Sequence, residues 1–499
     1  MGSLHIMPLA KTCFNWNIRL TNGELNMKPA NFANDLGAHR PEVGPAYDND
    51  RLGRVTPLDM ATRATIGSVI VSSGSGPKAV QDDHKYLAHV LDIPLSLSAY
   101  KEVSSIAQGI GVTRNFREVI DYFKVPANET PAGFKLGFVV ERDGLVQVDL
   151  IRDISCDKNG QKRPTDFLFS ADSANPYEVA PIKDLLGNLT CNPGIIYDLF
   201  INNPKANIGG HFKTRDEVMV EIGRTLGPGC DISVELDNPF ESDVQKLLDE
   251  AAKFREMLSP YRVVIKVPHT GSVNAANVGE LLAGDKKFHR RYDQGPTADL
   301  LRGHQLALFM REHGYRVNFT LMFEPYQTAM ALQAKPYFIN SFIRHRESQT
   351  AAIKRSLAQY RVTDDPSFLV DLRTLLVNTD YLSAEEKDFD LFQVKKMAER
   401  ILEYRQADGL DRNDGLDSVR HNLRMLKATN LPDTRLIVCS MEGDYNYPDI
   451  DRLLTEPEFA DVLDRLVITA QPDYLAKFTS CNQVVSYQRR FMNAASSAK

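Results

Sequence analysis

The sequence predicts an α/β protein whose larger part is a closed barrel of eight parallel strands wrapped by helices. From residue 165 onward, short apolar segments typical of buried strands alternate with segments of helical periodicity. This alternation favours a parallel sheet, and closure into a (β/α)8, or TIM, barrel removes the sheet edges while helices cover the outer face. The eight predicted strands lie at 167–171, 188–191, 232–236, 262–267, 316–322, 337–340, 435–440 and 465–469.

The chain of 499 residues is too long for a single ordinary core, so we expect further parts beside the barrel. A polar stretch at 156–164 is typical of a linker, and we take it as the boundary before the barrel. The segment 347–420 is too long for one connection and carries helical periodicity, so we interpret it as a helical insertion between the sixth and seventh strands. The expected parts are an extended or wrapping segment at 1–50, an α+β domain at 51–160, the barrel with its insertion at 161–485, and a C-terminal tail at 486–499.

Two local patterns stand out before the barrel. Apolar residues alternate over 134–140 and again over 146–150, and Asp143-Gly144 between them predicts a β-hairpin with a type I′ turn. The glycine- and serine-rich segment 72–78 follows an apolar strand and resembles a phosphate-binding loop. It lacks the spacing of the known nucleotide-binding motifs, so a plain turn is favoured.

Composition excludes several classes of protein. With 43% hydrophobic and 25% charged residues the chain is globular, and its net charge of −6 without a basic block argues against nucleic acid as a partner. The six cysteines have neither metal-ligand nor disulfide spacing, which fits a reducing cytoplasm. Neither a signal-peptide pattern nor an apolar run long enough to span a bilayer is present, so we expect no secretion and no membrane partner.

One lysine interrupts a strongly apolar, β-branched run at 263–270. Burying a cation in such a strand is costly unless the cation is paired or deprotonated. Burial lowers the pKa of an amine, and a neutral lysine is a nucleophile toward carbonyls, the first step of Schiff-base chemistry. The alternatives are a strand-end lysine that reaches solvent and a lysine in a structural ion pair. We therefore take Lys266 as a candidate nucleophile.

Polar residues gather at the C-terminal ends of the predicted strands, where functional side chains of such barrels are found. Each residue alone could be a strand cap or a turn former, and Asp172 and Asn192 could each begin a helix. The set as a whole is unusual, because two carboxylates, one lysine and several hydroxyl and amide groups would meet at one rim. Its members are Asp172, Asn192, Ser233, Glu235, Lys266, His269, Asn318, Thr320, Asn340, Arg344 and Arg346.

Several short motifs occur in chain order along these strands. They are Ala171-Asp172-Ser173-Ala174, Cys191-Asn192-Pro193-Gly194-Ile195, Ser233-Val234-Glu235-Leu236-Asp237, Val264-Ile265-Lys266-Val267-Pro268 and Asn318-Phe319-Thr320-Leu321-Met322-Phe323. Together with the last strand they resemble the transaldolase family of class I aldolases, whose fold is a lysine-dependent (β/α)8 barrel. The resemblance covers about residues 167–480, and residues 1–160 have no recognised counterpart.

The resemblance implies a role for each matching residue. Lys266 would form the imine with a donor ketose, and Asp172 would take and return the proton of the donor's C4 hydroxyl. Glu235, through a water also held by Thr320, would shuttle protons for imine formation and hydrolysis. Glutamate at 235 with a hydroxyl at 320 favours transfer of a dihydroxyacetone unit over its release, and no cofactor or metal is expected. The substrate-binding candidates are Asn192, Asn318, Ser233, Asn340, Phe342, Arg344, Arg346 and His269, although packing in the rim is favoured for the histidine.

The sequence departs from the family where the substrate phosphate is held. The family uses a serine and an arginine after the sixth strand, but here Asn340 and His345 stand at those positions, with Arg344 and Arg346 alongside. After the seventh strand the segment 439–444 is acidic and contains no arginine, and acidic groups repel a phosphate. The expected partner is a small-molecule sugar or sugar phosphate, with an unphosphorylated sugar favoured.

Two other functions stay open at this point. The same residues could serve a class I aldolase that releases dihydroxyacetone, or the barrel could be a non-catalytic scaffold or binding subunit. A homo-oligomer is compatible with either.

Overall fold

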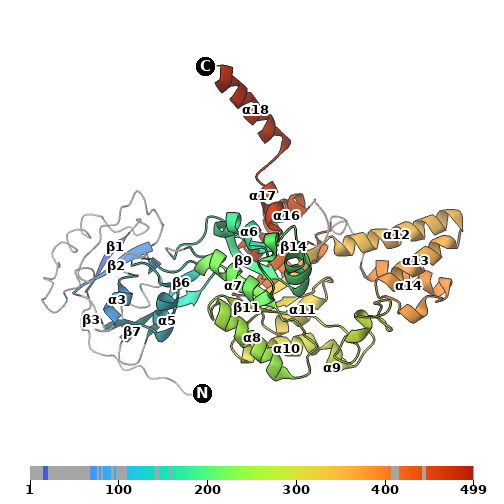
Figure 1. Ribbon diagram of the computed structural model, residues 1–499, viewed down its shortest axis with the longest axis horizontal. Coiled ribbons are helices and arrows are strands. Elements are labelled where there is room, and N and C mark those ends of the chain that lie inside the picture. The colour runs from blue at the N-terminus through green and yellow to red at the C-terminus, as the bar shows by residue number, and fades with distance from the viewer. Residues whose placement is uncertain are drawn as a thin grey trace. The chain divides into compact units, whose positions relative to one another are not determined.

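The computed structural model describes residues 15–20, 68–75, 78–79, 83–90, 95–96, 109–127, 129–140, 145–157, 160–405, 415–440 and 446–497 (Figure 1). The chain divides into two compact units, Met1–Arg163 and Pro164–Lys499. Most of the predicted segment 1–50, part of the 72–78 loop, the Asp143-Gly144 turn and the acidic residues 441–445 lie outside the described residues.

The first unit contains both helices and strands. One sheet has the order β1-β2-β4 and the other has the order β3-β5-β7-β6. The predicted hairpin is present, since β6 and β7 pair antiparallel from Phe134 opposite Arg152 to Val140 opposite Val146. The elements are β1 (Asn15–Leu20), β2 (Ser68–Ser75), β3 (Lys78–Ala79), α3 (His84–Leu87), β4 (Leu95–Ser96), β5 (Gly109–Val112), α5 (Arg114–Phe123), β6 (Phe134–Val140) and β7 (Leu145–Arg152).

Helix α5 packs against β7 because its apolar residues fall on one side. Thr113 caps the helix by accepting a hydrogen bond from the Phe116 backbone N–H, and Phe116, Val119 and Ile120 are buried. Alternate residues of β7 are buried as well, as expected for a strand with one face on a core.

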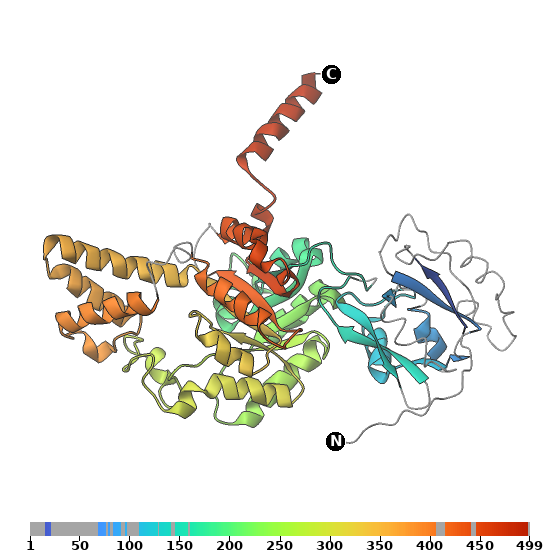
Figure 2. The same cartoon turned by 180° about the vertical axis from the view of Figure 1, so that it is seen from behind.

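The second unit is a closed parallel barrel whose strands lie among surrounding helices (Figure 2). Its eight strands follow the order β10-β11-β12-β13-β14-β15-β8-β9. All eight predicted strands are present, so the predicted fold class is confirmed. Their bounds are β8 (Leu168–Asp172), β9 (Leu186–Cys191), β10 (Asp231–Glu235), β11 (Val263–Pro268), β12 (Arg316–Thr320), β13 (Phe338–Ile343), β14 (Arg435–Ser440) and β15 (Leu466–Ala470).

Helices surround the strands and bury a continuous apolar shell between themselves and the barrel. Within the described residues, no helix has the length and apolar character needed to cross a bilayer. The α-helices around the barrel are α6 (Pro176–Val179), α7 (Arg215–Leu226), α8 (Val244–Leu258), α9 (Thr297–Leu300), α10 (Arg302–Glu312), α11 (Gln327–Gln333), α15 (Asp417–Lys427), α16 (Asn446–Thr455) and α17 (Pro472–Lys477). The last helix, α18 (Asn482–Ser497), has no buried residue. A π-helix, η3 (Gly194–Ile201), follows β9, and short 3₁₀ turns are η2 (Ala180–Leu185), η4 (Ile208–Gly210), η5 (Gly227–Gly229), η6 (Val278–Leu281), η7 (Ala384–Glu386), η9 (Pro457–Phe459) and η10 (Leu463–Arg465).

The predicted helical insertion lies between β13 and β14, beside the barrel in Figures 1 and 2. It consists of α12 (His345–Thr363), α13 (Ser367–Asn378) and α14 (Leu391–Tyr404), which share an apolar core of their own. The predicted end at 420 falls inside α15, whose Val419, Leu423 and Leu426 join the apolar shell of the barrel instead. The insertion therefore contributes a separate small core rather than extending the main one.

Alternation along each strand decides which side chains enter the barrel. In β11, Val263, Ile265 and Val267 belong to the outer apolar shell, so Val264 and Lys266 point into the lumen. The same rule directs Asp172 and Glu235 inward, because Ala171 and Val234 lie in the outer shell.

Candidate active site

Lys266 lies inside the barrel, in a strand that is buried throughout. All six residues of β11 are buried, and Lys266 itself is 6% exposed. The pairing of β10 with β11 places Glu235 beside Lys266, with 3.2 Å between Oε2 and Nζ. The lysine therefore does not reach solvent, and it forms a buried ion pair with the carboxylate of the neighbouring strand.

The charge of Lys266 depends on carboxylates as well as on burial. Burial lowers the pKa of the amine, but Glu235 and Asp172 raise it by more, so the pKa lies above the ordinary value for lysine. The lowered pKa expected from burial alone is therefore wrong, because it neglects charges that only the fold brings close. In this state the amine is an ammonium ion, and Glu235 is placed to accept its proton.

Asp172 ends β8 and shares the lumen with the lysine. The Thr190 hydroxyl donates a hydrogen bond to Asp172 Oδ1 at 2.7 Å. Burial raises the pKa of the Asp172 carboxyl, while Lys266 and the Thr190 hydroxyl lower it, and the net pKa lies above the ordinary value. A desolvated carboxylate of this kind is a stronger base than one in water, which suits proton removal from a hydroxyl.

The strand pairings arrange the lumen side chains in layers. Around the closed barrel, each strand is displaced along the barrel axis by about one residue relative to its neighbour. Side chains that lie at the same height in the lumen, which we call a level, therefore come from alternate strands. The level of Asp172 also contains Glu235, Thr320 and Cys439. The next level, toward the amino ends of the strands, contains Thr190, Lys266, Asn340 and Thr469. The four predicted catalytic residues thus occupy two adjacent levels of one lumen.

Ser233 lies in the floor beneath the lysine. Its hydroxyl donates to Asn188 Oδ1 at 3.0 Å, and Asn188 Nδ2 donates to the Ser170 hydroxyl at 3.0 Å. The three side chains are completely buried, so their mutual hydrogen bonds satisfy groups that have no access to solvent. The structure therefore places Ser233 below the reacting groups.

Two asparagines face each other beside Lys266. Asn318 pairs with Lys266 across β11 and β12, and its Oδ1 accepts a hydrogen bond from Asn340 Nδ2. Asn318 Nδ2 is buried and has no hydrogen-bond partner within the part of the chain that the structure describes. A buried amide donor without a partner is a group that a bound ligand can satisfy.

The rim above the lumen carries aromatic rings and one capping asparagine. Phe342 stacks on Phe323 with ring centroids 4.4 Å apart, and the His345 ring lies 4.8 Å from Phe323. Asn192 Oδ1 accepts a hydrogen bond from the Ile195 backbone N–H at 2.9 Å, so this side chain begins the π-helix η3. His345, at the position expected of a phosphate-binding arginine, is thus part of an aromatic group.

His269 faces away from the lysine. It follows Lys266 by three residues, and its ring meets Phe319 of the outer shell edge-on, with centroids 4.3 Å apart. Burial, together with His304, lowers the pKa of His269 to about 4, so the imidazole is neutral. The structure does not bring this predicted substrate contact together with the other site residues.

Arg344 precedes the first residue of α12 and forms ion pairs with two carboxylates. Its Nη2 lies 2.6 Å from Asp449 Oδ2, and its Nη1 lies 3.2 Å from Glu347 Oε2. Its backbone has a φ of 64°, a left-handed conformation in which a residue with a Cβ is strained.

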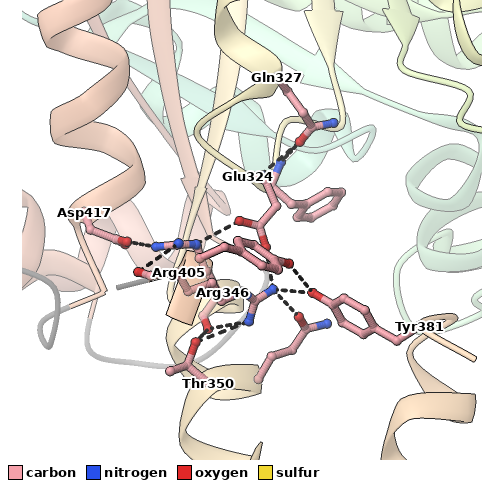
Figure 3. A network of polar contacts seen from close by, with 10 residues as sticks. Glu324, Gln327, Arg346, Thr350, Tyr381, Arg405 and Asp417 are labelled. Carbon is pink, nitrogen blue, oxygen red and sulfur yellow. Dashed lines mark hydrogen bonds and ion pairs between the residues drawn. The ribbon is translucent and has the colours of Figure 1, made fainter. Parts of the chain in front are cut away.

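Arg346 belongs to a buried ionic network that joins the insertion to the barrel (Figure 3). Its Nε lies 2.8 Å from Glu324 Oε2, and its Nη1 pairs with Asp417. Arg405, at the end of α14, pairs with the other oxygen of Glu324 and donates to the Tyr381 hydroxyl at 2.7 Å. Two cations thus meet two carboxylates, which leaves the network electrically neutral.

Several residues around the site were not among the predicted site residues. Alternation along β14 and β15 could have placed Cys439 and Thr469 in the lumen, because their neighbours belong to the outer shell. No comparable signal existed for Glu324 and Arg405, which are far apart in the sequence. Among the described residues, no group of three or more His, Cys, Asp or Glu side chains could hold a metal ion.

The fold and the lumen together define a class of protein, a (β/α)8 barrel with a lysine and two carboxylates at its centre. Residues 169–372, which run from β8 through β13 into α13, match the family described as Transaldolase/Fructose-6-phosphate aldolase. This match supports the transaldolase family for the barrel, and it supports aldolase-type chemistry through a lysine Schiff base in general. No curated protein matches the chain.

Proposed function

We propose that the protein is a transaldolase-type transferase of carbohydrate metabolism, which moves a dihydroxyacetone unit from a ketose to an aldehyde through an imine on Lys266. The observation that carries the proposal is the buried pair of Lys266 and Glu235, 3.2 Å apart, with Asp172 in the same lumen. The family match over residues 169–372 supports this chemistry in general. The transfer of this particular unit is our inference.

Imine formation begins with a proton transfer within the buried pair. The Lys266 ammonium gives a proton to Glu235, and the neutral amine attacks the ketose carbonyl to form a carbinolamine. Glu235 then returns a proton to the carbinolamine oxygen, which leaves as water, and a protonated imine remains. Thr320 lies level with Glu235 in the lumen, which supports our inference that it holds the water relaying these protons.

Carbon–carbon cleavage uses Asp172 and the imine. Asp172 removes the proton of the C4 hydroxyl, the C3–C4 bond breaks, and its electron pair flows into the protonated imine to give an enamine. The first aldehyde leaves, and the enamine adds to the carbonyl of the acceptor aldehyde. Asp172 returns its proton to the new hydroxyl, and water hydrolyses the imine to release Lys266. No cofactor is needed for this sequence.

The charged groups at the rim beside β13 favour a sugar substrate that carries no phosphate. Arg344 faces Asp449 and Glu347, while Arg346 lies between Glu324 and Asp417. A phosphate would have to displace carboxylates that are already hydrogen-bonded in a partly buried environment. We therefore propose unphosphorylated donors and acceptors, and the scattered cysteine pattern supports a cytoplasmic location.

Borohydride trapping tests the proposal. Incubation with a panel of ketoses and reduction with borohydride should add the mass of a reduced dihydroxyacetone unit to Lys266, and Lys266→Ala should abolish both adduct and turnover. Full activity in that variant, or no adduct with any donor, would contradict the proposal and favour a scaffold role. Product formation without an acceptor aldehyde would instead identify an aldolase that releases dihydroxyacetone.

A further inference from the structure

The hydroxyl of Thr469 is buried and unpaired among the described residues. The residue lies in β15, is 5% exposed, and its Oγ1 has no hydrogen-bond partner among the described residues. Leu466 and Ala470 of the same strand belong to the outer apolar shell, so alternation points Thr469 into the lumen. Its partner in the register is Ser170, which also faces the lumen.

The position of Thr469 relative to the reacting amine follows from the topology. In the closed order of eight strands, β15 lies four strands from β11, which is the opposite side of the barrel. The stagger of the strands sets Thr469 at the level of Lys266, together with Thr190 and Asn340. The hydroxyl therefore faces the amine across the lumen.

Unlike the hydroxyl of Thr469, those of Thr190 and Ser233 in the same lumen have hydrogen-bond partners. Thr190 donates to Asp172, and Ser233 is bonded through Asn188 to Ser170. A buried hydroxyl without a partner costs free energy. A valine would fill the same space without that cost.

We propose that Thr469 is a substrate-binding residue whose hydroxyl hydrogen-bonds a hydroxyl group of the three-carbon unit held on Lys266. This inference rests on the proposed function, since it takes dihydroxyacetone as the bound unit. A ligand anchored on β11 that extends across the lumen meets β15, and Thr469 is the polar side chain which that strand presents at this level. The site thus selects a polyhydroxylated carbonyl compound over a simple ketone.

The test compares three variants with the wild-type protein. Thr469→Val keeps the shape and removes the hydroxyl, whereas Thr469→Ser keeps the hydroxyl. Thr434→Val is the matched control, because Thr434 is also buried but its hydroxyl donates to the Pro336 carbonyl at 2.7 Å. Dihydroxyacetone binding is measured by calorimetry, thermal unfolding by circular dichroism, and the Lys266 adduct by borohydride trapping.

Thr469→Val should weaken dihydroxyacetone binding by about ten-fold with an unfolding midpoint equal to or above that of the wild type. Thr469→Ser should bind nearly as well as the wild type, and Thr434→Val should lower the unfolding midpoint without weakening binding. Unchanged affinity in Thr469→Val would overturn the inference, as would absence of dihydroxyacetone binding to the wild-type protein. Weakened binding in Thr469→Val without any wild-type adduct would uphold Thr469 as a contact to the sugar hydroxyl and refute the transfer chemistry proposed for Lys266.

Discussion

Nζ of Lys266 lies 3.2 Å from Oε2 of Glu235, across two neighbouring strands, with 8% and 15% of the two side chains exposed. A buried cation without its counter-ion is strongly unfavourable, so this pair affects stability as well as proton transfer.

Glu235→Gln should therefore lower both activity and stability. The amide cannot accept the proton of Lys266, so we expect imine formation to slow by about 100-fold or more. The buried ammonium would lose its nearest carboxylate and keep only the interaction with Asp172, which should lower the free energy of unfolding by about 3–5 kcal/mol. Stopped-flow trapping and urea denaturation measure the two effects. The matched control is Glu241→Gln, which removes the exposed pair with Lys246 and should change stability by less than about 1 kcal/mol.

Asp172→Asn should separate stability from catalysis. Because the pKa of Asp172 is raised, its protonated form is favoured in the folded state. The protonated carboxyl therefore contributes to the free energy of unfolding. This contribution is complete below the pKa that Asp172 has in the unfolded chain, and it is lost as pH rises through the pKa of Asp172 in the folded protein. Asparagine mimics the protonated form, so the variant should be at least as stable as the wild type at neutral pH while cleavage is lost.

The wild-type pH profile provides a further check on Asp172. Its carboxyl must be ionised to act as a base. The apparent pKa of the acid limb of the kcat/KM profile should therefore lie above the ordinary aspartate value of 3.8. A limb at or below that value would contradict the assignment of Asp172 as the base.

Arg405→Met should destabilise the junction between the insertion and the barrel. Glu324 would lose one of its two cations in a buried setting, at a cost of about 3–5 kcal/mol. Urea denaturation measures the loss, and hydrogen exchange should increase first in α12–α14. Arg361→Met, which removes an exposed pair with Glu399, is the control and should have little effect. Recovery in the double variant with Glu324→Gln would confirm that the unpaired charge causes the loss.

Phosphate recognition can be tested directly. Because Arg344 and Arg346 already meet carboxylates, a donor with a terminal phosphate should show no gain in kcat/KM over its unphosphorylated counterpart. Inorganic phosphate should not compete with the sugar at physiological ionic strength. A donor preference of ten-fold or more for the phosphate ester would show that these arginines rearrange to bind it.

His269→Asn should leave the chemistry largely unchanged. With a pKa of about 4 the histidine stays neutral from pH 5 to 8, and its ring packs on Phe319 outside the lumen. The pH profile of kcat should therefore coincide with that of the wild type, and the measurable effect should be a modest loss of stability. A shifted profile would place His269 in the proton relay after all.

The barrel could be predicted because its signals are local. Short apolar strands, helical periods between them and polar residues at the strand ends are all properties of neighbouring residues. The same alternation that places Lys266 inside the barrel also directs His269, three positions further on and just past the end of β11, to the outside. That inference was available from the sequence.

The charge state of the site could not be predicted in the same way. The pKa of Lys266 depends on Glu235 and Asp172, which reach it only through the register of different strands. Likewise, Arg346 looked like a phosphate ligand until the fold paired it with Glu324 and Asp417. Pairings of this kind depend on tertiary distances, about which the spacing of residues in the sequence says nothing.

The apolar core shared by α12, α13 and α14 is separate from that of the barrel. Substitutions within that apolar core, away from the ionic network of Arg346 and Arg405, should therefore disturb the eight strands less than substitutions in the shell of the barrel itself.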